Sequence, residues 1–181
     1  RFCIRKGRLY QRVPGFGKKS KENTYDGENL LNVHSYLTLN DITIAAIIDY
    51  KTYVKKPSLK YIESGIGLQL PTYMYLAKNS FKNIRFAGFY LQNITLDNKS
   101  EKDKEKSLKL IGFTNKDKDI LKEFDNNYVD SSVIDGIKIN NDGNFSSNSL
   151  KRMLNDDEIT EIINITEEKI NETIDNILKS K

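Results

Sequence analysis

Asp49 and Lys51 are the residues of this sequence whose types and spacing are best suited to chemistry. They follow Thr43 to Ile48, an uncharged run that predicts a strand buried on both faces. Because side chains alternate along a strand, the Asp49 carboxylate and the Lys51 amine would share one face, with Tyr50 on the other. Placing two charges at the end of a buried strand is costly. The pair therefore indicates a site that uses an acid and a base together, although an ordinary ion pair at a strand end is the alternative.

The strand that carries this pair is predicted to be half of a hairpin. Two strand-like runs, Leu30 to Leu39 and Ile42 to Tyr53, are separated only by Asn40-Asp41, which favours a tight turn. This hairpin is the framework on which the position of Asp49 depends.

A helix is predicted next, from about Ser58 to Lys78. Apolar residues recur there every three or four positions. Gln69 and Tyr73 are four residues apart, so they would lie on one face of this helix. Its start should be irregular because three helix-breaking residues lie inside the pattern, namely Gly65, Gly67 and Pro71.

The remaining sequence predicts further strands and helices. Strands are expected over residues 2 to 13 (one or two short ones), Ile84 to Ile94, Leu108 to Phe113 and near Val133 to Ile139. Helices are expected over Lys116 to Phe124 and Asp156 to Lys179, with a polar connection from Asn144 to Leu154. This order of elements predicts an α/β (or α+β) fold.

The closing helix carries an apolar stripe that should pack against the rest of the molecule. Its members are Ile159, Ile162, Ile163, Ile170, Ile174 and Ile177.

Length and composition limit the classes of protein. The 181 residues are enough for one domain with a hydrophobic core, and 30% charged residues indicate solvated loops. A net charge of +4 permits a polyanionic partner without requiring one. The single cysteine, Cys3, excludes an internal disulfide and favours a cytoplasmic location. No apolar run is long enough to span a membrane, and the start at Arg1 suggests a fragment of a longer protein.

Three motifs together resemble the nuclease domain of the RecB and AddB group of PD-(D/E)xK nucleases. They are Asp49-Tyr50-Lys51, the Gln-x-x-x-Tyr pattern of Gln69 and Tyr73, and Gly88-Phe89-Tyr90. The resemblance covers roughly residues 30 to 178 and is strongest for AddB. It implies a restriction-endonuclease-like PD-(D/E)xK core, a mixed central sheet flanked by helices. Residues 1–181 would then form a single nuclease-like domain cut from a longer helicase-nuclease subunit.

The resemblance also implies a reaction. Proteins of this group are metal-dependent deoxyribonucleases of recombination and double-strand break repair, so the chain would be an exonuclease that hydrolyses phosphodiester bonds in DNA with Mg²⁺, or Mn²⁺ in its place. Asp49 and the backbone carbonyl of Tyr50 would bind the metal, and Lys51 would activate the attacking water or stabilise negative charge. Gln69 and Tyr73 would support the site or contact the DNA backbone. The implied partners are DNA and a helicase region or partner helicase-nuclease subunit, with no membrane.

The sequence departs from the group at the second acidic metal ligand, which should come from the strand before Asp49. Asp26 and Asn32 are the candidates, unless the ligand is absent. An iron-sulfur cluster is not supported, because Cys3 does not match the cysteine pattern of AddB-like proteins. Two alternatives therefore stay open: a catalytically impaired nuclease-like fold that binds DNA or scaffolds a partner subunit, and an interaction module built on the closing helix.

Overall fold

The computed structural model describes residues 2–5, 8–11, 33–39, 42–53, 55–95 and 106–179. Its strands are β1 (Phe2–Arg5), β2 (Arg8–Gln11), β3 (Val33–Leu39), β4 (Ile42–Lys51), β5 (Ile84–Asn93), β6 (Ile111–Asn115) and β7 (Met153–Leu154). Its helices are the 3₁₀ turn η1 (Ile62–Ser64), α1 (Gln69–Ser80), α3 (Lys118–Phe124), α4 (Ser147–Leu150) and α5 (Asp156–Lys179).

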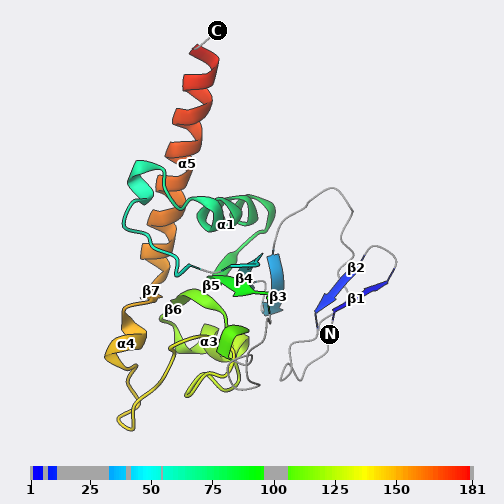
Figure 1. Cartoon of the computed structure of the whole chain (residues 1–181), viewed down its shortest axis with the longest axis vertical. Coiled ribbons are helices and arrows are strands. Elements are labelled where there is room, and N and C mark those ends of the chain that lie inside the picture. Colours follow the sequence, from blue (N-terminus) through cyan, green and yellow to red (C-terminus); the bar gives the residue numbers. More distant parts are fainter. Residues whose placement is uncertain are drawn as a thin grey trace.

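β4 lies inside a five-stranded mixed sheet with the order β3-β4-β5-β6-β7 (Figure 1). It pairs antiparallel with β3, and the partners Leu39 and Ile42 confirm the predicted hairpin, whose turn residues lie outside the described part of the chain. It pairs parallel with β5, so the connection through α1 is a crossover. The mixed sheet with its flanking helices confirms the α/β fold class. The one or two short strands expected over residues 2 to 13 are present as β1 and β2, which pair antiparallel in a sheet of their own.

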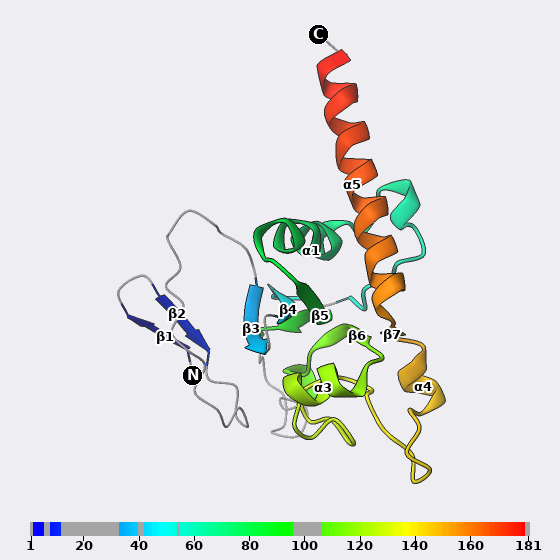
Figure 2. The ribbon, with the colours of Figure 1, turned by 180° about the vertical axis from the view of Figure 1, so that it is seen from behind.

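The two faces of the sheet bury two separate hydrophobic clusters. Figures 1 and 2 show α1 and the first part of α5 on one face and α3 on the other. The first cluster consists of Ala45, Ile47, Ile62, Leu70, Met74, Ala77, Phe86, Phe89, Ile159, Ile162 and Ile163. The second consists of Ala46, Ile48, Ala87, Tyr90, Leu110, Ile120, Leu121, Phe124, Ile134, Ile137 and Met153. Odd-numbered residues of β4 thus face α1 and even-numbered residues face α3, as strand alternation requires.

β5 approaches β6 too closely for a side chain at two glycines, Gly88 on β5 and Gly112 on β6. A Cβ atom built on Gly88 would lie 2.5 Å from the carbonyl oxygen of Phe113 and closer still to the hydroxyl of Tyr90. The β4–β5 register also shifts at this point, since Ala45 pairs with Phe86 but Ala46 pairs with Gly88. Gly88 is therefore required by close packing at a bulge.

The helix predicted from Ser58 begins only at Gln69. Gly65 and Gly67 have φ values of +77° and +82°, and this left-handed backbone ends the short turn η1 before α1 can start. Pro71 falls in the first turn of α1, where its missing N–H would have no helical partner in any case.

The predicted strand near Val133 to Ile139 is wrong, because this segment makes only isolated bridges within an irregular region. Its apolar residues serve the second cluster from a loop. The predicted polar connection from Asn144 to Leu154 contains α4 and β7, because the Ser146 hydroxyl caps α4 and the two residues of β7 pair with β6. The strand expected over Leu108 to Phe113 is present as β6, shifted toward its C-terminal side.

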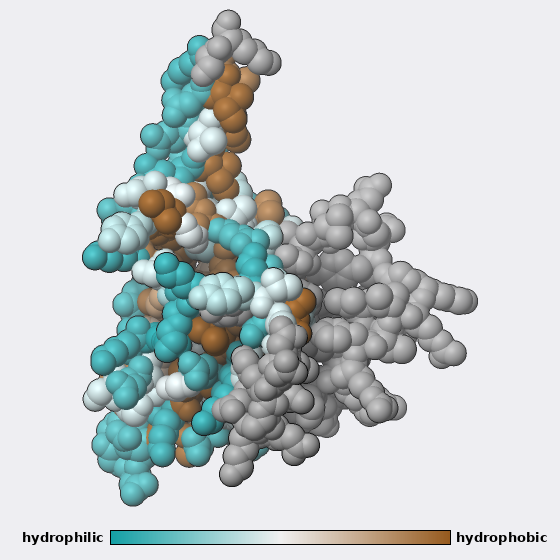
Figure 3. Space-filling view, in the orientation of Figure 1, coloured by the Kyte–Doolittle hydropathy of each residue, from teal (hydrophilic) through white to brown (hydrophobic). Residues whose placement is uncertain are grey.

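α5 has the predicted bounds, but only its first half is packed. A reciprocal capping box starts it: the Asn155 side chain accepts from the backbone N–H of Glu158, and the Glu158 carboxylate accepts from that of Asn155. The last two residues of the apolar stripe are exposed: the exposed fraction is 48% for Ile174 and 60% for Ile177. The expectation that the whole stripe packs is therefore corrected. Figure 3 shows this apolar strip on the projecting end. No helix among the described residues is long and apolar enough to cross a membrane.

A charged cluster ties β5 to the starts of α3 and α5. The Arg85 guanidinium donates to the carboxylates of Asp117 and Asp156, and Asn115 donates to Asp156 at 2.7 Å. Burial acts to raise the pKa of Asp117, but hydrogen bonds from the Asp119 backbone and Arg85 outweigh it and lower that pKa. This cluster fixes the far end of β5, away from the Asp49 end of the sheet.

Gly88→Ala should lower the free energy of unfolding by about 3 kcal/mol, because the new methyl group meets backbone on β6. Gly143→Ala is the matched control, since its added Cβ meets nothing and the cost is only that of φ +80°, about 1 kcal/mol. Urea unfolding of both variants measures the difference. Equal losses would contradict close packing at position 88.

Candidate active site

β4 delivers Asp49 to the end of the sheet on the face that α1 covers. Asp49 continues the series Ala45 and Ile47, both buried in the cluster beneath α1. Its own exposure is only 7%, so the carboxylate is largely withdrawn from water. Lys51, the last residue of β4, lies on the same face and is half-buried, while Tyr50 packs with the opposite cluster. The strand alternation predicted from sequence is therefore confirmed.

α1 supplies the other two predicted side chains. Gln69 is its first residue, and Tyr73 follows one turn later. The Lys51 ammonium lies 2.8 Å from Oδ2 of Asp49 and donates to Oε1 of Gln69 at 2.9 Å. Nε2 of Gln69 then donates to the hydroxyl of Tyr73 at 3.2 Å. The structure thus joins four predicted site side chains from two elements in one continuous chain of contacts, namely Asp49, Lys51, Gln69 and Tyr73.

Donor and acceptor chemistry fixes the direction of this chain. Lysine can only donate, so the amide oxygen of Gln69 must face Lys51 and its amide nitrogen must face Tyr73. The Tyr73 hydroxyl accepts that bond, and its own proton meets no acceptor among the described residues. A half-buried hydroxyl and an ammonium therefore stand at the surface next to a buried carboxylate.

The Asp49 carboxylate is incompletely satisfied. Oδ2 lies within ion-pair distance of Lys51, but the direction of approach does not meet hydrogen-bond geometry, so this buried oxygen has no hydrogen-bond partner among the described residues. The ammonium offsets much of the charge of this carboxylate, but the missing hydrogen bond leaves the oxygen able to take a further partner. Carboxylate oxygens are the ligands that a divalent metal such as Mg²⁺ prefers, so the group fits such an ion.

A complete set of acidic ligands is not visible in the described residues. No group of three histidine, cysteine, aspartate or glutamate side chains within them could hold a metal ion. The candidates for the second ligand, Asp26 and Asn32, lie outside the described ranges.

The position of the site suits ligand binding. Asp49 and Lys51 lie at the carboxyl end of β4, whose parallel neighbour is β5, and the helix of the crossover starts beside them. In open α/β sheets, ligands bind at the carboxyl ends of such strands. Here the arrangement offers an anionic oxygen for a cation and an ammonium for an anion within a few ångströms of each other.

Phe89 and Tyr90, the third part of the sequence motif, belong to the core. Phe89 stacks on Phe113 in the cluster under α1, and Tyr90 is fully buried on the other face, with its hydroxyl bonded to Thr114. Burial raises the pKa of the Tyr90 phenol. These residues hold β5 in place beside β4 and do not reach the candidate site.

Replacing Asp49 by asparagine tests whether the ion pair is structural. Asparagine keeps an oxygen beside the Lys51 ammonium and removes a buried negative charge that has no hydrogen bond at Oδ2. Asp49→Asn should therefore leave the free energy of unfolding unchanged within about 0.5 kcal/mol, or raise it. The control is Asp156→Asn, which removes a carboxylate that accepts from Arg85 and Asn115 and should cost about 1.5–3 kcal/mol. A loss of that size at position 49 would mark an ordinary structural ion pair.

The chain is similar to part of a known class of enzyme subunit. It is 34% identical over 108 residues to an ATP-dependent helicase/deoxyribonuclease subunit of Carboxydothermus hydrogenoformans, a match that covers 51% of this chain and 10% of that protein. It is 35% identical over 91 residues to the subunit of the same name from Lactobacillus gasseri, covering 47% of this chain and 8% of that protein. No family model matches the chain.

The matches thus span about a tenth of the length of these relatives and about half of the present chain. They support, in coarser form, the resemblance seen in the motifs: this chain is related over part of its length to a helicase/deoxyribonuclease subunit.

Proposed function

We propose that this chain is a metal-dependent deoxyribonuclease domain with a PD-(D/E)xK core, which hydrolyses phosphodiester bonds in DNA repair. The observation that carries the proposal is the contact of Lys51 with both Asp49 and Gln69, which joins the two sequence motifs in one site. The partial similarity to a helicase/deoxyribonuclease subunit supports it independently.

Asp49 would hold a Mg²⁺ or Mn²⁺ ion together with the backbone carbonyl of Tyr50. The Lys51 carbonyl points toward β5, since it accepts a hydrogen bond from the backbone N–H of Ile94, the residue after that strand. Successive carbonyls of a strand point in opposite directions, so the Tyr50 carbonyl points away from β5. Mg²⁺ usually takes one or two protein oxygens and fills its remaining positions with water and substrate phosphate. When bound, the metal would supply positive charge against the anionic phosphodiester.

Lys51 is proposed to stabilise the negative charge that develops on the phosphoryl oxygens. Its ammonium donates to the Gln69 oxygen and lies 2.8 Å from the Asp49 carboxylate, so in this arrangement it acts as a donor of positive charge. A general base would need the neutral amine. Between the two roles expected from sequence, these contacts therefore favour electrostatic stabilisation.

Gln69 and Tyr73 are proposed to position Lys51 and the substrate. Gln69 accepts a hydrogen bond from the ammonium that also contacts Asp49, and Tyr73 fixes the orientation of the Gln69 amide. The free proton of the Tyr73 hydroxyl could then be donated to a phosphate oxygen of the DNA backbone. A helicase region or partner helicase-nuclease subunit would deliver the DNA, and processing from an end would make the domain an exonuclease.

Cleavage of end-labelled linear DNA, single- and double-stranded, with Mg²⁺ tests the proposal. Lys51→Ala should lower the rate about 10²- to 10³-fold, because it removes a charge-stabilising group at the reaction centre. Lys82→Ala is the control, since this exposed lysine lies past the opposite end of α1 and should keep the wild-type rate. Equal cutting by wild type and Lys51→Ala would overturn the role of Lys51.

A second candidate function has its own support. The sequence before Asp49 lacks the group's usual pattern for the second acidic ligand, which favours a nuclease-like fold that binds DNA or scaffolds a partner without cutting.

Calorimetric titration with Mn²⁺ separates the two candidates. A nuclease should show saturable binding that Asp49→Asn abolishes and that Asp175→Asn, on the exposed end of α5, leaves intact. Absence of any saturable site in the wild type, together with salt-sensitive DNA binding, would favour the non-cutting fold.

A further inference from the structure

The connection between β4 and α1, residues 52–68, is rich in lysine and tyrosine; we name it the lysine–tyrosine loop. From Tyr50 to Ile62 the chain contains no acidic residue, and Glu63 is the one acid of the loop. The lysines of this stretch are Lys51, Lys55, Lys56 and Lys60. The three that belong to the loop are exposed, so the loop presents positive charge to solvent.

The loop also exposes aromatic rings. Tyr53 is 82% and Tyr61 51% exposed. The other aromatic residues whose side chains the structure describes are all buried or half-buried. Both exposed rings thus belong to the one connection that joins the two halves of the candidate active site. Exposed aromatic rings among lysines form a combination suited to a ligand that is both planar and negatively charged.

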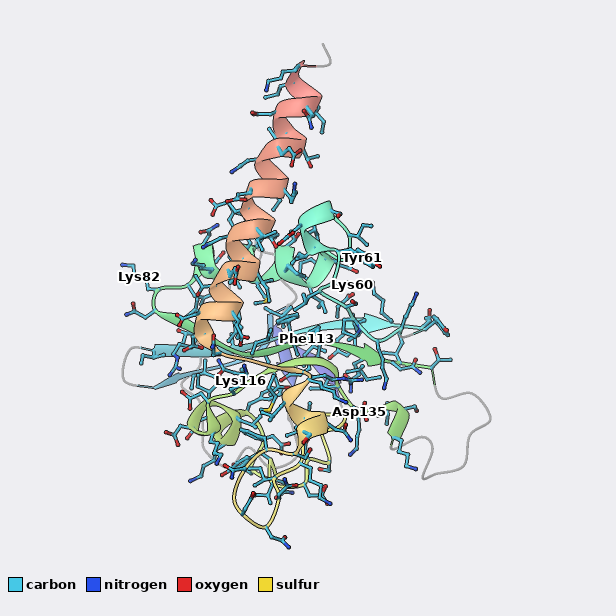
Figure 4. All side chains as sticks on the ribbon, turned by 90° about the vertical axis from the view of Figure 1, so that its left-hand side faces the viewer. Lys60, Tyr61, Lys82, Phe113, Lys116 and Asp135 are labelled. Atoms are coloured by element: carbon cyan, nitrogen blue, oxygen red, sulfur yellow. The ribbon has the colours of Figure 1, made fainter. Side chains whose placement is uncertain are left out.

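Local structure holds part of the loop in a defined shape. Ile62 is buried in the cluster under α1, and Leu59 packs against the same cluster. Backbone hydrogen bonds from Ser64 and Ile66 to the Tyr61 carbonyl close the turn. Lys60 and Tyr61, between the two anchors, therefore point outward, and the Lys60 ammonium lies 5.2 Å from the centre of the Tyr61 ring. Figure 4 shows these two residues together beside the turn.

The loop begins and ends at the candidate active site. Its ends are joined by the 2.9 Å hydrogen bond from Lys51 to Gln69. Tyr53 follows Lys51 by two residues, a rise of about 7 Å at most in extended chain. The other limb returns past Ser58, whose carbonyl oxygen would lie 3.3 Å from a Cβ built on Gly67. The exposed tyrosines and lysines are thus carried by a closed loop that Asp49 and Lys51 adjoin.

We propose that the lysine–tyrosine loop binds single-stranded DNA and places the sugar-phosphate backbone of the DNA next to Asp49 and Lys51. This inference rests on the proposed nuclease function. Tyr53 and Tyr61 stack on bases, and the lysines contact phosphates. Base faces are available for stacking in a single strand but are covered by neighbouring bases in a duplex. A purely electrostatic surface would need the lysines alone and would leave both exposed rings without a role.

Fluorescence anisotropy with a labelled oligothymidine strand, measured in EDTA so that no metal-dependent cleavage occurs, tests the inference. Tyr53→Ala and Tyr61→Ala should each weaken binding at least about fivefold, while Tyr53→Phe, which keeps the ring, should bind like the wild type. Thermal unfolding checks that the exposed substitutions leave the fold intact.

A matched pair of charge variants tests the lysines. Lys55→Gln with Lys56→Gln should reduce the slope of log affinity against log salt by about 1.4, for two lost phosphate contacts to a single strand. Lys78→Gln with Lys82→Gln removes the same charge from two exposed positions, one near the end of α1 and one just after it. Lys78 lies about 14 Å along the helix from Gln69, so this pair should leave the slope unchanged.

Two results would overturn the inference. One is that the alanine variants of both tyrosines bind the single strand as tightly as the wild type does. The other is that a duplex of the same sequence binds as tightly as the single strand and loses as much affinity in the alanine variants. Binding that depends on the tyrosines in a protein that never hydrolyses DNA would support the loop and refute the nuclease. Hydrolysis of DNA with no contribution of the tyrosines to binding would support the nuclease and refute the role of the loop.

Discussion

The Lys51 ammonium joins the end of β4 to the first residue of α1, since it contacts Asp49 on its own strand and Gln69 across the crossover. Everything proposed for this molecule depends on that junction. It sets the distance between the carboxylate and the helix, and it closes the loop that carries the exposed lysines and tyrosines. The two hydrophobic clusters and the Arg85 cluster hold β4, β5 and α1 in the positions that make the junction possible.

Asp49 in β4 and Asp156 in α5 illustrate how a binding site differs from a structural ion pair. Asp156 accepts hydrogen bonds from Arg85 and Asn115 and lies in the first turn of α5, at its positive end, so its charge is matched on several sides. Asp49 is more deeply buried, yet its inner oxygen has a neighbouring ammonium and no hydrogen bond among the described residues. A buried carboxylate oxygen that lacks a hydrogen bond is the condition expected where a ligand completes the site.

Sequence predicted the site better than its surroundings. Strand alternation placed Asp49 and Lys51 on one face correctly, and the four-residue spacing placed Gln69 and Tyr73 on one side of α1. The irregular start predicted for the helix from its glycines is confirmed, but the regular helix begins at Gln69 and not near Ser58, because left-handed Gly65 and Gly67 follow the short turn η1. The exposure of Tyr61 was not predicted, since a tyrosine beside leucine and isoleucine has the composition of a core segment.

The most direct measurement is a crystal structure of the protein soaked in Mn²⁺, with anomalous scattering used to locate the metal. The nuclease account predicts a peak within about 2.5 Å of an Asp49 carboxylate oxygen, with the Tyr50 carbonyl as a further ligand. It also predicts that the Lys51 ammonium moves away from Oδ2, because metal and ammonium compete for that oxygen. A crystal with no peak at Asp49 and the ion pair unchanged would contradict the account.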